Sequence, residues 1–412
     1  MALVNQPRPA GQHTVRRHNS ALVLGAVVES PGMSRAGVAA RTGLAKATVS
    51  SLVDRLVAAG LLAETGPQAR SGRGRRGTGL SLSPSGPHGL GVEIGVDYLA
   101  TCLVDLTGEV HALRIRPGDN RAASVARVLA RVTRAVRTAF ADAQRRGVPV
   151  GGVGVAVPGL VEAATGLLRV APNLGWRDVD VRAEVRRRLG LGDLPVLVGN
   201  EADFAALAEL WCGGHPDLRD FLHVSGEIGI GAGLVVDGTL FRGVRGFGGE
   251  IGHVCVDPVG PECACGARGC LERLAGQEWI LRAAGVWDGV GPLRPPAALL
   301  DELVDRLTAE DGRALRAVRG AGRSLGIGVS AVLNAVDVPT VVLGGSYARL
   351  ERWLRPSLQN ELDRRVVSAA WSRVEVLGAT LGTEAAVRGA AGAVLHEIII
   401  DPDPYVSTVL PG

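Results

Sequence analysis

The sequence has little lysine, cysteine or aromatic content, and it has no long apolar run. Lys46 is the single lysine among 45 basic residues, so the chain holds no Gly-Lys-Ser/Thr segment and no P-loop of that type. Six cysteines in 412 residues are too few for a disulfide scaffold. Apolar runs such as Gly151–Leu160 are broken by glycine and fall short of the about 20 residues that a membrane span needs.

The sequence also lacks the features of a secreted or a disordered chain. Its N-terminus runs into proline and arginine rather than a long apolar stretch, so no secretory signal is visible, and we expect a cytoplasmic protein with no membrane partner. Hydrophobic residues make up 46% and charged residues 21%, which is typical of a folded globular chain. The length of 412 residues favours two or three domains.

The positive charge is concentrated at the N-terminus. Residues 1–85 hold eleven basic and three acidic residues, a balance of +8, whereas the whole chain carries only +4 and the remainder is therefore acidic by 4. A basic head on a mildly acidic body indicates a polyanionic partner for the head.

Three helical patterns lie in this basic head, at about 19–30, 34–42 and 45–59. Between the second and third, Ala39, Gly43 and Val49 stand at relative positions 0, 4 and 10. A small residue is needed where the helices cross, and Gly43 permits a left-handed turn. This spacing predicts a helix-turn-helix whose third helix enters the major groove of DNA.

Two short alternating segments follow, at 61–64 and 80–82, and they predict a pair of strands. Between them, Gln68–Thr78 carries four arginines among glycines. We interpret this as the wing of a winged helix, with a tip that enters the minor groove. A plain three-helix bundle with solvated arginines is the alternative.

The exposed N-terminal side of the third helix and the wing supply the predicted DNA contacts. The predicted base contacts are Lys46, Ala47, Ser50 and Ser51. The predicted phosphate or minor-groove contacts are Thr48, Arg16, Arg17 and the wing residues Arg70, Arg73, Arg75 and Arg76.

A turn-rich stretch at 83–89 marks a linker, so we place a winged helix-turn-helix domain at 1–82 and a second domain at 90–412. Strands and helices alternate in the second domain, which predicts the α/β class with a mixed sheet. The expected strands are 90–94, 100–106, 151–157, 195–198, 221–225, 231–236 and 340–343, and the expected helices are 121–146, 202–210, 298–319 and 321–335.

Five short segments occur in one order along the second domain: Val155–Gly159, Pro172–Trp176, Asn200–Asp203, Gly249–His253 and Cys263–Glu272. This ordered set resembles the ROK family, which comprises repressors, open reading frames and sugar kinases. The resemblance covers nearly the whole chain and implies two lobes of the actin-like sugar-kinase fold around a sugar cleft. Lobe 1 is expected at about 90–199 plus 382–412, and lobe 2 at about 200–381. A winged helix before such a body resembles the transcriptional-regulator branch.

A metal-binding pattern lies in the last of these segments. His253, Cys263, Cys265 and Cys270 give the spacing H-x9-C-x-C-x4-C. Three sulfurs and one imidazole suit tetrahedral Zn²⁺, and four protein ligands leave no open position, so a structural zinc is expected. Buried, reduced thiols are the alternative. Cys255 falls outside the ROK zinc pattern and is expected in a strand.

The same resemblance implies a sugar site. Asn200, Glu201, Glu250, His253 and Glu272 match the sugar-contacting positions of ROK kinases. A carboxylate can accept hydrogen bonds from two sugar hydroxyls. His253 is expected to serve both sites, with one ring nitrogen on zinc and the other facing the sugar. Surface acids without a shared role are the alternative.

Two turns that bind phosphate in ROK kinases are altered in this sequence. Glu93–Asp97 reads E-I-G-V-D where the family has D-x-G-G-T, and Glu227–Gly231 reads E-I-G-I-G where the family has G-T-G-I-G. Added carboxylates and a branched side chain oppose a close approach of phosphate. Glu201 stands at the position of the catalytic Asp, where a Glu can still act as a base. We therefore expect no enzyme activity, with an ATP-dependent sugar kinase carrying a DNA-binding head as the alternative.

These features together predict a sugar-responsive DNA-binding transcriptional regulator. We expect a repressor that leaves double-stranded operator DNA when a monosaccharide or sugar derivative binds the cleft, and an activator with the same parts is the alternative. A homodimer or homotetramer is expected, because two recognition helices must meet two half-sites.

Overall fold

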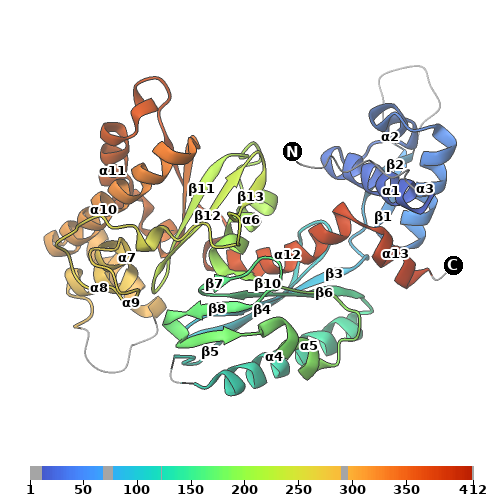
Figure 1. The fold of residues 1–412 in the computed structure, drawn as a ribbon. Helices are drawn as coiled ribbons and strands as arrows, with labels where there is room; N and C mark the ends of the chain where they lie inside the picture. The colour runs from blue at the N-terminus through green and yellow to red at the C-terminus, as the bar shows by residue number, and fades with distance from the viewer. Residues whose placement is uncertain (1–11, 68–77, 122, 289–295, 411–412) are drawn as a thin grey trace, which may run out of the picture.

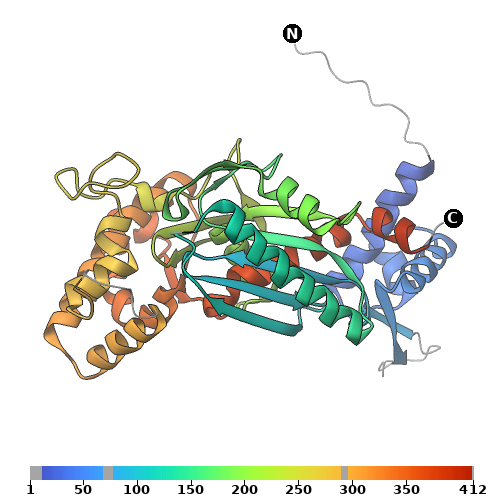
Figure 2. The same cartoon turned by 90° about the horizontal axis from the view of Figure 1, so that it is seen from below.

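The computed structural model describes residues 12–67, 78–121, 123–288 and 296–410. Two large lobes lie side by side, and a small N-terminal head sits at the far end of one of them (Figure 1). The view from below shows lobe 2, lobe 1 and the head in an elongated row (Figure 2). None of the described helices is long and apolar enough to cross a membrane.

The head is a three-helix unit with a two-stranded sheet, as predicted. Its elements are α1 (Gln12–Glu29), α2 (Arg35–Thr42), α3 (Lys46–Ala58), β1 (Leu62–Pro67) and β2 (Thr78–Leu82). Ser34 caps α2, where its side chain accepts a hydrogen bond from the Gly37 N–H at 3.3 Å. Gly43 adopts the left-handed conformation at φ 73°, which directs the chain from α2 into α3. The predicted tip of the wing lies outside the described residues.

Lobe 1 is built on a five-stranded sheet of order β10-β6-β3-β4-β5. Its strands are β3 (His88–Ile94), β4 (Tyr98–Val104), β5 (Val110–Pro117), β6 (Val150–Val157) and β10 (Val196–Asn200). A small sheet joins its edge, formed by β7 (Leu160–Val161), β8 (Leu168–Ala171) and β9 (Trp176–Val179). Helices α4 (Val125–Arg146) and α5 (Val181–Leu189) cover one face, and α12 (Ala385–Ile400) covers the other (Figure 1).

Lobe 2 repeats the same strand arrangement, in the order β13-β12-β11-β14-β15. Its strands are β11 (Phe221–Gly226), β12 (Ile230–Val236), β13 (Thr239–Phe241), β14 (Thr340–Gly345) and β15 (Glu375–Gly378). Helix α6 (Glu201–Cys212) lies on the face toward lobe 1. The opposite face is covered by α7 (Glu272–Ala275), α8 (Gln277–Ala284), α9 (Pro296–Thr308), α10 (Gly312–Val336) and α11 (Ser346–Arg365).

Two segment boundaries differ from the sequence predictions. The helix predicted at 298–319 is broken, because Glu310 is left-handed at φ 58° and Asp311 starts a new helix by accepting from two backbone N–H groups. Helix α10 then runs unbroken through the predicted 321–335 helix. Strand β3 begins at His88, inside the predicted linker, since the His88 N–H donates to the Pro149 carbonyl at 2.8 Å.

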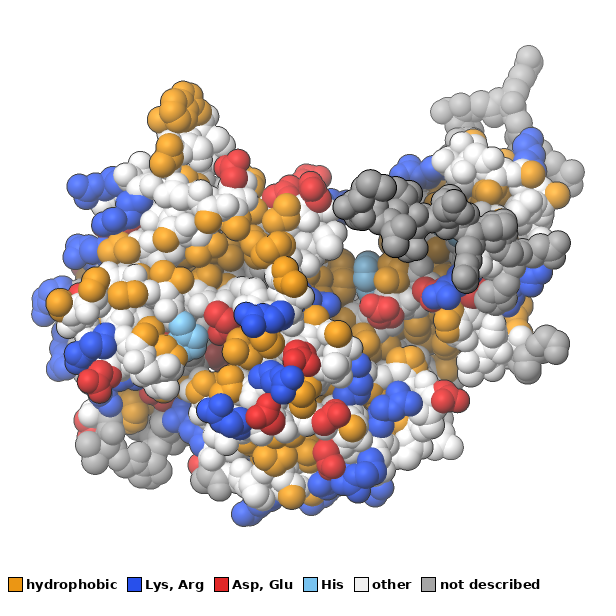
Figure 3. All heavy atoms as spheres, in the orientation of Figure 1, with side chains coloured by type: hydrophobic (Ala, Val, Ile, Leu, Met, Phe, Trp, Pro, Cys, Tyr) orange, Lys and Arg blue, Asp and Glu red, His pale blue; other side chains and the backbone are white. Residues whose placement is uncertain are grey.

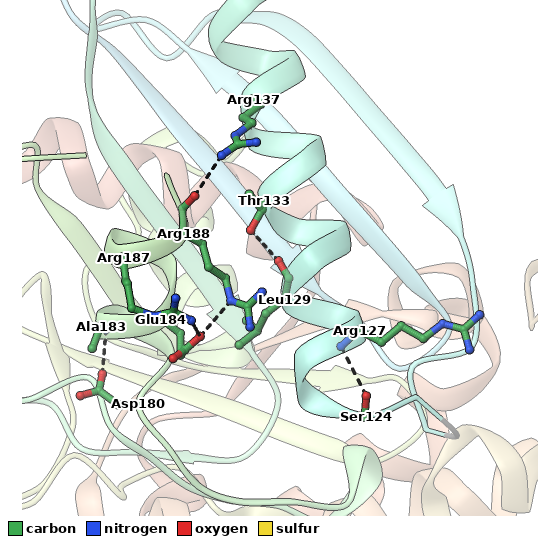
Figure 4. Close-up of polar contacts among 10 residues, drawn as sticks. All are labelled: Ser124, Arg127, Leu129, Thr133, Arg137, Asp180, Ala183, Glu184, Arg187 and Arg188. Carbon is green, nitrogen blue, oxygen red and sulfur yellow. Dashed lines mark hydrogen bonds and ion pairs between the residues drawn. The ribbon is translucent and has the colours of Figure 1, made fainter. Parts of the chain in front are cut away.

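Local partners hold three arginines on the outer helices of lobe 1, Arg137, Arg187 and Arg188 (Figure 4). Arg137 donates to the Arg188 carbonyl at 3.1 Å and so ties α4 to α5. Glu184 pairs with Arg187 at 2.7 Å and with Arg188 at 2.8 Å. Basic and acidic side chains alternate over this face of the lobe (Figure 3). The arginine content of the body therefore does not mark a basic surface there.

Helix α12 lies unusually close to the lobe 1 sheet. A Cβ at Gly91 or Gly154 would come within 2.0 Å and 1.9 Å of α12 carbonyl oxygens, so only glycine permits this approach. The C-terminal half of α12, with Leu395 and Ile398, shares one hydrophobic core with the head. The short helix α13 (Asp403–Val409) lies against the head as well (Figure 1). One helix therefore reaches from the region between the lobes to the N-terminal head.

Candidate functional site

The cysteine-rich loop folds back on itself before α7. An antiparallel bridge joins Cys255 to Cys270, and a second one joins Glu262 to Arg268. Gly269 is left-handed at φ 63°, and a Cβ there would lie 1.5 Å from the Asp257 carbonyl oxygen. The glycine is therefore required for the loop to close. Cys255 is exposed and forms only this isolated bridge rather than part of a longer strand.

The structure brings the four predicted metal ligands together. The ligand atoms of His253, Cys263, Cys265 and Cys270 all lie within 4.8 Å of one another. The Cys263 Sγ lies 3.7 Å from the His253 Nδ1, and the Cys265 and Cys270 sulfurs are 3.6 Å apart. Zinc–ligand bonds of about 2.3 Å to sulfur and about 2.0 Å to nitrogen imply tetrahedral edges of about 3.5–3.8 Å. These residues therefore fit a tetrahedral zinc ion.

Two of the predicted sugar ligands flank the same imidazole. Glu250 Oε2 lies 3.9 Å from the His253 Nε2, and Glu272 Oε1 lies 3.7 Å from the His253 Nδ1. Glu272 also accepts from the Cys263 thiol at 2.9 Å. The nitrogen of His253 that faces the thiols is thus Nδ1, and Nε2 points to Glu250. This is the arrangement that a shared histidine requires.

Asn200 has a structural task that the sequence did not reveal. Its Oδ1 caps α6 by accepting from the Ala202 N–H at 2.7 Å, and its Nδ2 donates to the Gly159 carbonyl at 2.9 Å. Both polar atoms are therefore engaged within the protein. The side chain fixes the first turn of α6 and with it the position of Glu201.

Glu201 lines a small cavity between the lobes. Glu93 from β3 and Glu227 from the β11–β12 turn line the same cavity, as does the N-terminal end of α12. Burial raises the pKa of Glu93 to about 7. Burial, followed by the charge of Glu93, raises the pKa of Glu227 to about 8. Burial and both of these neighbours also raise the pKa of Glu201 well above its ordinary value.

Three carboxyl groups thus occupy the region of the two altered turns. They line one cavity between the lobes. His223 also lines it, is fully buried, and has no hydrogen-bond partner for either ring nitrogen among the described residues.

Sequence reasoning missed part of this lining. His223 and Ser225 lie on strand β11 and Thr383 lies in a short 3-10 helix, so none of the three carries a motif. Asn173 does not line the cavity but lies near the proposed sugar ligands, and its place in one of the five ordered segments could have indicated it. A Cβ at Gly229 would lie 3.4 Å from the Asn173 Nδ2 and 3.3 Å from the Glu272 Oε2, so both side chains face the same turn.

In the head, most of the predicted contacts of α3 are free. Lys46, Ala47, Thr48 and Ser51 are exposed. Ser50 is half-buried, and its Oγ accepts from the Arg35 guanidinium at 3.0 Å.

The arginines predicted to contact DNA fall into three groups. Arg16 is exposed on α1. Arg17 forms an ion pair with Asp401 of the body, so its guanidinium is held between head and body. Arg70, Arg73, Arg75 and Arg76 lie outside the described residues.

Comparison with known proteins matches both parts of the chain. The ROK family matches residues 89–397, and the MarR family matches residues 17–74. The xylose repressor of Bacillus subtilis (strain 168) is 29% identical over 393 residues, covering 95% of this chain and 98% of that protein.

Solved structures agree with these matches. A ROK family transcriptional regulator, a homolog of the E. coli MLC protein, has a TM-score of 0.80 at 25% identity, covering 97% of this chain and 100% of that chain. A ROK family glucokinase from Streptomyces griseus, solved with glucose and AMPPNP, has a TM-score of 0.63 at 26% identity, covering 74% of this chain and 98% of that chain. The predicted fold is confirmed, and the chain belongs to the ROK family, with a winged helix in front of its ROK domain.

Proposed function

We propose that this protein is a sugar-responsive DNA-binding repressor. The observation that carries the proposal is the joining of an exposed recognition helix to a two-lobed ROK body through one shared hydrophobic core. Its similarity over nearly full length to a xylose repressor supports the same function.

We propose that the sugar binds beside the cysteine loop. Glu250, His253 and Glu272 converge there, and Glu201 of the cavity lining is close enough for the charge of Glu250 to contribute to its raised pKa. Asn200 would contribute mainly by fixing Glu201. Because a relative is named a xylose repressor, xylose is the first sugar to test.

We further propose that His253, Cys263, Cys265 and Cys270 hold a structural zinc ion. Four protein ligands complete its coordination, so the metal supplies rigidity rather than a site for water. The loop would then hold the His253 ring in one orientation, with Nε2 toward the sugar.

The response to sugar is proposed to pass along α12. Sugar binding closes the two lobes, and Ala385 and Ala386 at the start of α12 line the cavity between them. The other end of α12 contacts α1 of the head. In a homodimer or homotetramer, closure would change the spacing of two recognition helices, whose half-sites lie about 34 Å apart.

We propose that the body is no longer a kinase. The carboxyl groups of Glu93, Glu201 and Glu227 line the cavity, and a carboxyl group does not supply the positive charge or the converging N–H donors that hold a nucleotide phosphate. The similarity to a glucokinase supports the alternative function, an active sugar kinase with a DNA-binding head.

One set of experiments tests the proposal. DNA fragments selected by the purified protein from random sequence are used to measure affinity by fluorescence anisotropy, with and without each of a panel of monosaccharides. We expect specific binding that one sugar weakens at least tenfold. The kinase would instead be established if the protein turned over ATP in the presence of Mg²⁺ and the same sugar, and if Glu201→Ala abolished that turnover. Absence of any sequence-selective DNA binding would refute the repressor.

A further inference from the structure

We propose a second metal site in this protein, formed by His88, Asp105 and His111 at the junction of head and body. These residues come from the first position of β3, from the turn between β4 and β5, and from β5. One ligand atom from each lies within 4.8 Å of those of the other two. The site is separate from the cysteine loop, which belongs to lobe 2.

His88 provides the main observation. It is fully buried, and its Nδ1 lies 2.9 Å from the Gly86 carbonyl oxygen. A carbonyl only accepts, so Nδ1 carries the proton and Nε2 presents a lone pair. That Nε2 is buried without a hydrogen-bond partner among the described residues. A histidine whose Nδ1–H donates to a backbone carbonyl has the tautomer and orientation of a metal ligand.

Asp105 is held in a fixed orientation by its own turn. It is fully buried, and its Oδ1 accepts from the Thr107 N–H at 2.8 Å, the Thr107 hydroxyl at 2.6 Å and the Glu109 N–H at 3.1 Å. Its Oδ2 faces the Nε2 of His111 at 2.8 Å. One oxygen is thus saturated, and the other is directed toward His111.

His111 completes the group and opens it to solvent. Its ring meets the ring of His88 edge-on, with centroids 4.7 Å apart. Its side chain is 27% exposed, so an ion and a water molecule can reach the cluster from this side. A simple hydrogen bond would account for the contact between His111 and Asp105. It would not account for the buried Nε2 of His88, which has no hydrogen-bond partner among the described residues.

Two imidazoles and one carboxylate suit a borderline divalent ion such as Zn²⁺, Co²⁺ or Ni²⁺ rather than Ca²⁺ or Mg²⁺. Metal–ligand bonds of about 2.0–2.2 Å imply ligand–ligand distances of about 3.4 Å, so binding would draw His88 toward the other two residues. A water molecule would take the fourth position.

The location gives the site a consequence for the head. Gly86, whose carbonyl orients His88, touches the head closely, since a Cβ there would lie 2.2 Å from the Gly60 carbonyl oxygen. Leu106, next to Asp105, packs in the core shared by head and body. A bound ion would therefore connect the segment that leads out of the head to the β4–β5 turn.

Cobalt binding to the metal-free full-length protein tests the proposal. We expect two equivalents of Co²⁺ per chain for the unaltered protein. Cys265→Ser should leave one equivalent without a thiolate-to-cobalt charge-transfer band, whereas His111→Ala should leave one equivalent with that band. The double variant should bind none. His18→Ala, at an exposed histidine of α1, serves as the matched control and should keep two equivalents.

Melting temperature gives a second readout that does not depend on counting ions. Excess Co²⁺ should raise the melting temperature of Cys265→Ser by a few degrees, and this shift should vanish when His111→Ala is added. A single equivalent in the unaltered protein, lost entirely in Cys265→Ser, would overturn the proposal. The proposal would also be overturned if His111→Ala changed neither the number of Co²⁺ ions bound per chain nor the rise in melting temperature.

Discussion

At the residue scale, the buried acids between the lobes make stability depend on pH. Folding raises the pKa of Glu93 to about 7 and that of Glu227 to about 8, whereas an unfolded Glu titrates near about 4.3. Between about pH 5 and pH 8 the folded state therefore binds more protons than the unfolded state. Stability is fully present at the acidic end of this window and falls as the pH rises through it.

We predict that Glu227→Gln flattens this dependence. The amide keeps the size of the side chain but carries no charge, so the variant should melt a few degrees above the unaltered protein at pH 8 and close to it at pH 5.5. Differential scanning calorimetry at both pH values measures the effect. Glu262→Gln, at an exposed side chain, is the control. An unchanged slope in Glu227→Gln would show that Glu227 is already ionised at pH 5.5.

The cysteine loop gives a second prediction at this scale. Cys265→Ser should lower the zinc content by one equivalent per chain and weaken sugar binding, since His253 would lose its fixed orientation. Elemental analysis and a thermal-shift titration with the effector sugar measure both effects. Cys255→Ser, at an exposed cysteine outside the ligand set, should change neither. Unaltered zinc content in Cys265→Ser would show that the ligand set is wrong.

Single residues were predictable from the sequence where the spacing alone specified a chemistry. The cysteine loop is such a case, because its ligands lie within 18 residues of one another and the structure brings them together. The engagement of Asn200 with Gly159 and of Arg17 with Asp401 was not predictable. Those partners are 41 and 384 residues away in the sequence, and only the tertiary fold brings them together.

At the element scale, the contact of α12 with the lobe 1 sheet depends on glycine. We predict that Gly154→Ala destabilises the protein by about 3 kcal/mol, because its Cβ would lie 1.9 Å from the Ala390 carbonyl oxygen. Urea unfolding measures the change.

Gly25→Ala is the control for this substitution. A Cβ at Gly25 meets nothing within 4 Å, and alanine favours the helix α1, so this variant should be neutral or slightly more stable. A Gly154→Ala protein as stable as this control would show that α12 does not lie so close to β6.

Helices and strands were predicted well where one buried face gives the apolar residues a single regular spacing along the sequence. The 298–319 helix was predicted wrongly because its apolar pattern continues across a break that Glu310 and Asp311 create. A capping Asp inside a periodic stretch is a local signal, but it competes with the hydrophobic pattern on both sides. The small β7–β8–β9 sheet was not predicted, since strands of two to four residues carry too little pattern.

At the scale of the whole molecule, the basic charge of the N-terminal residues is a property of the head alone. We predict that Lys46→Glu lowers DNA affinity at least tenfold, because an exposed cation at the start of α3 becomes an anion that the negatively charged DNA repels. Fluorescence anisotropy measures the affinity, and circular dichroism checks that the fold is kept.

Arg364→Glu, an exposed charge reversal on α11 of lobe 2, is the matched control. It changes net charge equally and should leave DNA affinity within about twofold, since α11 lies in the lobe that is farther from the head (Figure 1). Equal losses in both variants would mean that net charge, rather than α3, governs the binding.

The two-lobed body was predictable only through its resemblance to a family, because alternating strands and helices alone do not specify strand order. The position of the head was not predictable at all. It follows from a core in which Val23 and Leu24 of α1 meet Leu395 and Ile398 of α12, and no local pattern pairs these segments.

If the response to sugar passes along α12, as we propose, this helix would act as a lever. Its 16 residues span about 24 Å at 1.5 Å per residue. A tilt of about 5° at the cavity would displace the far end by about 2 Å, which is comparable to the helix shifts that separate the two states of many allosteric proteins. The contacts of α12 with the glycines of β3 and β6 would then be the point about which the helix tilts. A larger residue there would move the pivot, and the same sugar would produce a different displacement at the DNA.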